Sequence, residues 1–169
     1  GYGAVYYLEN VLRDDGQDIK GKTIAASGFG NVCWGICKKA AELGAKVVTL
    51  SGPDGYIYDP DGVVTEEKIN YLLEMRSSGR NRVKDYADKF GVEFHAGEKP
   101  WGVKADIIMP SAMQNDVHME EAKQIAANKI RYYIEVANMP TTNDALQFLL
   151  EQKDMIVAPS KAVNAGGVA

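Results

Sequence analysis

The stretch that most constrains the fold is a glycine-containing turn between an apolar run and a helical pattern. Thr23–Ala26 is typical of a buried strand, Ser27–Gly30 of the turn, and Asn31–Leu43 of a helix. A helix N-terminus presents backbone N–H groups without intrahelical partners at the positive end of the helix dipole. Glycine lets the backbone turn sharply and lets a phosphate approach without a Cβ in the way. The segment therefore predicts a site for the pyrophosphate of a dinucleotide.

The residues that follow complete one strand–helix–strand unit of about 30 residues. Gly44 ends the helical pattern, and Lys46–Ser51 is a β-branched run typical of a second strand. Asp54 lies 24 positions after Gly30, near the place where dinucleotide-binding units have an acid that hydrogen-bonds the adenosine ribose. Cys33 stands where Gly or Ala is usual, but Cys is also small enough for close helix–strand packing. The alternative is that the two glycines form only a tight turn.

The rest of the chain alternates helical patterns with short apolar runs. This alternation predicts an α/β fold: a Rossmann-type doubly wound, mostly parallel sheet with helices on both faces. Further helices are predicted over 1–13, 65–78, 82–90 and 116–128, and from an N-cap at Thr141 to about Glu151; further strands over 92–95, 105–110, 132–136 and 155–158; and a small hairpin or extended loop at the sheet's rim over 56–62.

Composition restricts the possible partners. The chain has 169 residues, of which 46% are apolar, so we expect one dinucleotide-binding domain over residues 1–169. A net charge of −4 gives no reason to expect nucleic acid or an anionic membrane. Cys33 and Cys37 are interpreted as buried thiols in a reducing, cytoplasmic setting rather than a disulfide or zinc ligands. His95 and His118 have no partners at ligand spacing, so we expect no metal.

Small and polar residues follow each predicted strand of the sheet. Ligands of such sheets bind beyond the carboxyl ends of the strands, and amides can pair with both a carboxamide and ribose hydroxyls. Each of these residues alone can equally be a turn or cap residue. No Lys or Arg lies between Lys46 and Lys68 to meet an adenosine 2′-phosphate, so NAD is favoured over NADP. The residues in question are 28–32, 52–54, 111–115, 137–138, 159–161 and 164.

Five segments resemble the hexameric amino-acid dehydrogenases of the glutamate dehydrogenase type. They occur in the family's order across nearly the whole chain, and the last two are the most specific. The version with Gly52-Pro53-Asp54 is similar to the NAD-dependent clostridial form. The segments are Gly28–Val32, Ser51–Ile57, Pro110–Asn115, Glu135–Thr142 and Pro159–Val168.

The resemblance implies a set of NAD contacts. Residues of the glycine turn would hold the pyrophosphate and the adenosine side, and Pro53 and Asp54 would contact the adenosine ribose. Three residues after the 105–110 strand would line the middle, and Asn138 and Asn164 would meet the nicotinamide end. The turn residues are Gly28, Phe29, Gly30, Asn31 and Val32, and the middle residues are Ala112, Gln114 and Asn115.

The resemblance also implies what this chain lacks. The family's catalytic Lys and Asp belong to an N-terminal substrate domain whose motifs do not occur here, so no catalytic residue is assigned. We expect a coenzyme domain from a longer two-domain, homohexameric enzyme that reversibly deaminates L-glutamate, and we expect the domain alone to bind NAD(H) without turnover. The alternatives are a leucine-, valine- or phenylalanine-type dehydrogenase, a nucleotide-sensing module, and a methyltransferase that binds S-adenosylmethionine.

Overall fold

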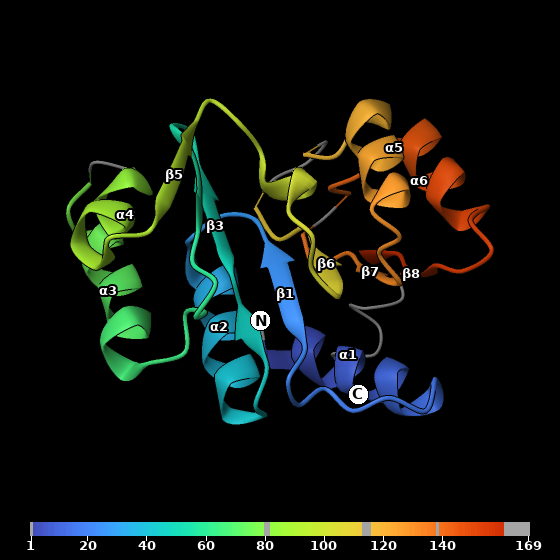
Figure 1. Cartoon of the computed structure of the whole chain (residues 1–169), viewed down its shortest axis with the longest axis horizontal. Helices are drawn as coiled ribbons and strands as arrows, with labels where there is room; N and C mark the ends of the chain where they lie inside the picture. Colours follow the sequence, from blue (N-terminus) through green and yellow to red (C-terminus); the bar gives the residue numbers. More distant parts are fainter. Residues whose placement is uncertain (1, 80–81, 113–115, 138, 161–169) are drawn as a thin grey trace.

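A five-stranded parallel sheet forms the centre of the computed structural model, which describes residues 2–79, 82–112, 116–137 and 139–160 (Figure 1). The strand order is β2-β1-β6-β7-β8. The chain therefore runs outward from β1 to β2 and later returns to the other side of β1, which makes the end of β1 a topological switch point. The strands are β1 (Thr23–Ala26), β2 (Lys46–Val47), β6 (Ile107–Met109), β7 (Tyr132–Ile134) and β8 (Ile156–Ala158).

Helices cover both faces of this sheet. Helices α1 (Tyr2–Asp14) and α2 (Asn31–Glu42) lie on one face, and α5 (Met119–Ala127) and α6 (Asn143–Leu150) lie on the other (Figure 1). Alternate residues of each strand enter the two cores, because successive side chains point to opposite faces. Ile24 and Ala26 pack in the α1–α2 core, and Ala25 packs in the α5–α6 core. The predicted fold class is confirmed.

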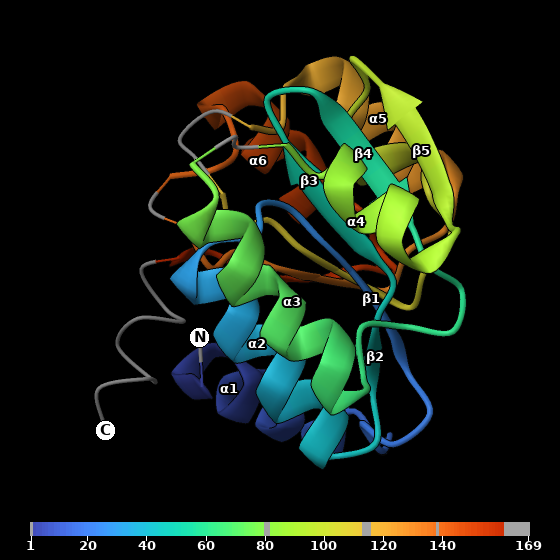
Figure 2. The ribbon, with the colours of Figure 1, turned by 90° about the vertical axis from the view of Figure 1, so that its left-hand side faces the viewer.

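A second sheet of three antiparallel strands stands beside the first. It contains β3, β4 and β5 in that order, with β4 in the middle. Helix α4 packs on β4 and α3 packs between α2 and α4, as Figure 2 shows. A single 3-10 turn, η1, connects this part to β6. The elements are β3 (Thr49–Gly52), β4 (Gly55–Tyr58), α3 (Glu66–Ser77), α4 (Lys84–Phe90), β5 (Glu93–Ala96) and η1 (Pro100–Gly102).

The predicted strand Lys46–Ser51 is wrong as one element, because it divides at Val48. The Thr49 hydroxyl accepts a hydrogen bond from Ala26 N (2.9 Å) and donates one to Ala26 O (2.7 Å). It thereby occupies the backbone groups that a longer β2 would have paired. The carbonyl of Val48 accepts instead from Asp59 N at 2.8 Å. The chain leaves the parallel sheet at this point and begins the antiparallel one.

Two further predictions need adjustment. The segment expected to be a rim hairpin or loop over 56–62 supplies the middle strand of the second sheet, and its hairpin with β3 turns at Pro53 and Asp54. The N-cap of α6 is Thr142 rather than Thr141. Thr141 is buried, and its hydroxyl is hydrogen-bonded to the Tyr133 hydroxyl. Among the described residues, no helix has the length and apolarity needed to cross a membrane.

Candidate functional site

The turn after β1 requires glycine at its first position. Gly28 has a φ of +84°, and a Cβ added there would lie 3.2 Å from the Cβ of Ala112. A side chain is disfavoured by this left-handed conformation. The amide of Gly28 donates to the Ser51 hydroxyl at 2.8 Å, which fixes the turn against β3. Gly28 is therefore needed by the fold itself.

Gly30 has a different environment. It is the N-cap of α2 with a φ of −83°, and its carbonyl accepts the first helical bond from Trp34 N at 2.9 Å. A Cβ added to Gly30 would meet nothing within 4 Å. No side chain caps this helix, and the first amides of α2 have no partner among the described residues. The fold leaves open space in front of a helix N-terminus, which is the physical requirement for binding an anion.

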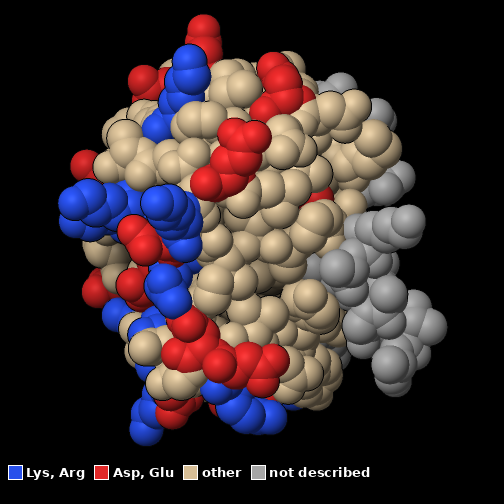
Figure 3. All heavy atoms as spheres, turned by 90° about the vertical axis from the view of Figure 1, so that its right-hand side faces the viewer, with Lys and Arg blue, Asp and Glu red and all other residues tan. Residues whose placement is uncertain are grey.

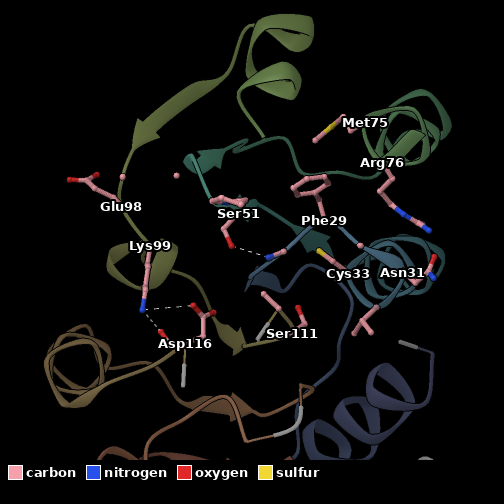
Figure 4. Close-up of a pocket in the computed structure, with 18 of the residues that line it drawn as sticks. Phe29, Asn31, Cys33, Ser51, Met75, Arg76, Glu98, Lys99, Ser111 and Asp116 are labelled. Atoms are coloured by element: carbon pink, nitrogen blue, oxygen red, sulfur yellow. Dashed lines mark hydrogen bonds and ion pairs between the residues drawn. The ribbon is translucent and has the colours of Figure 1, made fainter. Parts of the chain in front are cut away.

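A cavity of about 770 Å³ lies at the carboxyl ends of β1, β3 and β6 (Figure 4). This volume is in the range of small-molecule and cofactor sites. The cavity extends from the glycine turn to both sheets and to the end of α3. Its walls are residues 28–33 of the turn and α2; 51–53 and 55 of the β3–β4 hairpin; Met75, Arg76 and Gly79 at the end of α3; 97–99 after β5; and Ser111, Ala112 and Asp116 after β6.

Two buried serines join the ends of β1 and β6 beneath this cavity. The Ser27 hydroxyl accepts from the amides of Ser111 (3.0 Å) and Ala112 (3.1 Å), and the Ser111 hydroxyl donates to the carbonyl of Ser27 (2.7 Å). These bonds satisfy backbone groups where the two strands separate. They hold the crevice at the switch point in a fixed shape.

Asp54 has structural partners that the sequence did not indicate. Its two carboxylate oxygens accept from the amides of Val83 (3.1 Å) and Lys84 (3.0 Å), at the N-terminus of α4. The carboxylate thus fastens the β3–β4 hairpin to α4, and Asp54 is not among the residues lining the cavity. A contact between Asp54 and a ribose stays a prediction, whereas its neighbour Pro53 lies in the cavity wall.

Charged side chains stand at two ends of the cavity. Arg76 lies at one end, near Met75 and above Asn31, while Lys99 and Asp116 lie at the other (Figure 4). Arg76 is an exposed residue of α3. No Lys or Arg lies between Lys46 and Lys68 in the sequence, and Arg76 reaches this wall only through the packing of α3 on α2.

Lys99 and Asp116 form a polar pair on the β6 side. Lys99 Nζ donates to the main-chain carbonyl of Asp116 at 2.8 Å and lies 3.9 Å from its Oδ1. Burial raises the pKa of the Asp116 carboxyl, and the nearby Ser27 hydroxyl and Lys99 ammonium partly oppose this effect. Asp116 is only 7% exposed. The sequence offered no motif for this pair.

Most of the predicted contacts that the structure describes come together. Gly28, Phe29, Gly30, Asn31, Val32, Pro53 and Ala112 all line the one cavity. The Phe29 ring packs against Gly52, where a Cβ would lie 2.9 Å from it. Gln114, Asn115, Asn138 and Asn164 lie outside the described residues.

The histidine side chain of His95 has an aromatic and an acidic neighbour rather than a group of metal ligands. The ring of His95 stacks on Tyr56 with the centroids 4.6 Å apart and lies 3.4 Å from Glu98. In the part of the chain that the structure describes, no three His, Cys, Asp or Glu residues are grouped so as to hold a metal ion.

Comparison with known proteins identifies the family. The model for Glutamate/Leucine/Phenylalanine/Valine dehydrogenases matches residues 1–169. The NAD-specific glutamate dehydrogenase of Clostridium symbiosum is 71% identical over 168 residues, covering 99% of this chain and 37% of that protein. The NADP-specific glutamate dehydrogenase of Haemophilus influenzae is 44% identical over 169 residues, covering all of this chain and 37% of that protein.

Solved structures of similar proteins lead to the same family as the sequence comparisons. A glutamate dehydrogenase structure with 71% sequence identity superimposes with a TM-score of 0.97, covering 99% of this chain and 37% of that one. Glutamate dehydrogenase 2 of Plasmodium falciparum, 40% identical, gives a TM-score of 0.90 and covers 99% of this chain and 36% of that one. The chain thus spans somewhat over a third of the length of these proteins. With a family match over its whole length, the chain belongs to the glutamate/leucine/phenylalanine/valine dehydrogenase family.

Proposed function

We propose that this chain binds NAD as the coenzyme domain of a glutamate dehydrogenase. The observation that carries the proposal is the open N-terminus of α2 at Gly30, where the fold tolerates a side chain but has none. A turn that served only the fold would not need glycine at this position. The relatives named NAD-specific glutamate dehydrogenases support the identity of the ligand.

Within this proposal, the residues of the cavity hold the two halves of the dinucleotide on either side of the glycine turn. The amides at the start of α2 bind the pyrophosphate, and the Ser27–Ser111 bonds fix the ends of β1 and β6 relative to each other. NAD, when bound, supplies the hydride acceptor.

The whole enzyme that we propose reversibly deaminates L-glutamate to 2-oxoglutarate and ammonia. Its substrate-holding groups belong to an N-terminal domain, and the enzyme assembles as a homohexamer. Hydride transfer requires a substrate held close to the nicotinamide ring in a defined orientation. This chain alone is therefore expected to bind NAD(H) but not to convert glutamate or 2-oxoglutarate.

Calorimetric titration of the chain with NADH, NADPH and S-adenosylmethionine tests the proposal. NADH is expected to bind most tightly, because no described cation other than Arg76 lines the adenosine side of the cavity. Tighter binding of S-adenosylmethionine would favour a methyltransferase, and NADPH binding equal to that of NADH would show that Arg76 or another cation reaches a 2′-phosphate. Turnover of glutamate by the pure chain would contradict the proposal that the substrate-holding groups belong to another domain.

A further inference from the structure

A second cavity lies at the end of the parallel sheet opposite to the glycine turn. Its volume is about 340 Å³, within the range of small-molecule sites, and its walls are the amino ends of β1, β6 and β7 with the loops before them. Its described wall contains four cations and one carboxylate, although the whole chain has a net charge of −4. On the side of the molecule that carries β6–β8, Lys and Arg side chains gather along one edge (Figure 3). The cations of the cavity are Lys22, Lys104, Lys129 and Arg131, and the carboxylate is Asp106.

The carboxylates near this cavity already have partners. Asp106 Oδ2 accepts from Thr23 N at 2.9 Å and from Thr23 Oγ1 at 3.2 Å, which joins the amino ends of β1 and β6. Both oxygens of Asp15 accept from the Arg131 guanidinium at 2.8 Å. Because Asp15 neutralises Arg131, three lysines remain against the single charge of Asp106, and the cavity retains a positive charge.

None of the three lysines forms an ion pair with a carboxylate of the described residues. Lys22 Nζ donates to the amide oxygen of Gln17 at 3.3 Å, which leaves the NH₂ group of Gln17 as a further donor. The side chains of Lys104 and Lys129 are exposed. Like charges around one cavity repel one another, so an anion bound between them would remove this repulsion.

The backbone of Lys129 has a conformation that favours glycine. Lys129 follows Asn128, the C-cap of α5, and has a φ of +57°. A side chain is disfavoured in this left-handed conformation, so helices that end in it commonly have glycine there. Lysine at this position therefore costs stability, and a ligand that needs its ammonium group would account for it. Helices α1 to α4 end in the same conformation with a glycine, at Gly16, Gly44, Gly79 and Gly91.

We propose that this second cavity binds the polyphosphate chain of a small anion, a role that goes beyond the proposed binding of NAD. Ammonium groups are donors only, and several of them around one cavity match the many acceptor oxygens of linked phosphates. The cavity is too small for a folded partner or a duplex. Its apolar wall residues are Ala105 and Tyr132, so the phosphates rather than an apolar group supply most of the contacts.

The test uses inorganic tripolyphosphate with the coenzyme cavity blocked, because a phosphate chain is also expected to bind the amides of α2. Calorimetric titrations are made on the chain saturated with NADH and, separately, on a Gly30→Val variant, in which valine occupies the space in front of those amides. Saturable binding of tripolyphosphate is expected in both. Binding should weaken as the salt concentration rises, since the contacts are between charges.

Lys129→Gly separates binding from stability. It should weaken tripolyphosphate binding about tenfold through the loss of one charge-assisted bond, yet raise the melting temperature by about 2–4 °C because glycine is unstrained in this conformation. A loss of binding in a more stable variant has no explanation in unfolding. Lys104→Gln should also weaken binding about tenfold, and Lys129→Arg, which retains the charge, should bind within about twofold. Lys84→Gln removes an exposed lysine of α4, beside the second sheet, and is the matched control that should leave the affinity unchanged.

Comparison of ATP with tripolyphosphate identifies the source of the phosphates: ATP that binds more than about fivefold more tightly indicates a nucleotide, and equal affinity indicates the phosphate chain alone. Absence of tripolyphosphate binding with the coenzyme cavity blocked would overturn the inference, and so would unchanged affinity in both Lys129→Gly and Lys104→Gln. A hexaglutamate peptide that binds more tightly than tripolyphosphate would overturn the choice of phosphate. Failure of the unmodified chain to bind NADH, with tripolyphosphate still bound by the Gly30→Val variant, would contradict the proposed function alone.

Discussion

Replacing Gly30 by Val should abolish dinucleotide binding while the chain remains folded. The φ of −83° and ψ of −163° at Gly30 are allowed for valine, and its Cβ would meet nothing within 4 Å. The branched side chain would occupy the space in front of the first amides of α2. A pyrophosphate excluded from that space loses its hydrogen bonds to those amides.

The size of the effect follows from those bonds. A hydrogen bond to a charged group contributes about 1.5–3 kcal/mol, so losing two of them reduces affinity by about 100-fold or more. The loss of stability is smaller, because valine is a poorer N-cap than glycine by an amount on the order of 1 kcal/mol. Gly30→Ser separates the two effects further. Its hydroxyl caps α2 and should leave stability unchanged or slightly higher, yet it competes with phosphate for the same amides.

Calorimetry with NADH and urea unfolding followed by circular dichroism measure the two quantities. Gly28→Ala is the matched comparison, because Gly28 has a φ of +84° and its Cβ would lie 3.2 Å from Ala112. That change should destabilise the fold by about 1–2 kcal/mol. Folded Gly30→Val and Gly30→Ser variants that bind NADH as tightly as the unmodified chain would refute the argument, since the glycine would then be only part of a turn.

Three further predictions concern charged groups. Asp54→Ala should lower the free energy of unfolding by about 1 kcal/mol, because the amides of Val83 and Lys84 lose their cap; an unchanged urea midpoint would contradict this. Lys68→Met should cost about 3 kcal/mol in the same assay, because it leaves the buried Asp59 carboxylate without the ammonium group 2.7 Å away; a stabilised variant would contradict this. Arg131 and Tyr132 hold the pKa of Asp15 at about 2, below its ordinary 3.8. The ionised Asp15 therefore stabilises the folded chain fully above about pH 4, and this contribution to the free energy of unfolding is lost as pH falls toward 2. Asp15→Asn should make the melting temperature depend less on pH in that range. A melting temperature that falls as steeply with acid in the variant as in the unmodified chain would contradict this.

The glycine turn could be predicted from sequence because its signal is local. A strand, two glycines and a helix dictate the geometry of Gly28 and Gly30 within a few residues. The end of the predicted strand at Val48 could not be predicted in the same way. It depends on the Thr49 hydroxyl reaching both backbone groups of Ala26, 23 residues earlier in the chain. A threonine in a β-branched run gives no sign of such a contact.

The walls of the cavity were predictable only in part for the same reason. Pro53 and Ala112 follow strands directly, so their place at the carboxyl edge follows from the topology. Arg76 comes from the end of α3, and its position depends on how that helix packs on α2. Asp54 was noticed for its charge and spacing, but its bonds to α4 join positions about 30 residues apart. Pairings of this kind become visible only in three dimensions.

The departure of β3 from the parallel sheet has an evolutionary consequence. The cavity wall that contains Pro53 is built on a small sheet of its own, with its own hydrogen-bond ladder and packed helices. Substitutions in the β3–β4 turn therefore leave the pairing of the parallel strands untouched. Selection can exchange the residues of this wall while the glycine turn at the end of β1 stays constant, and relatives named for NAD and for NADP both align with this chain over nearly its whole length.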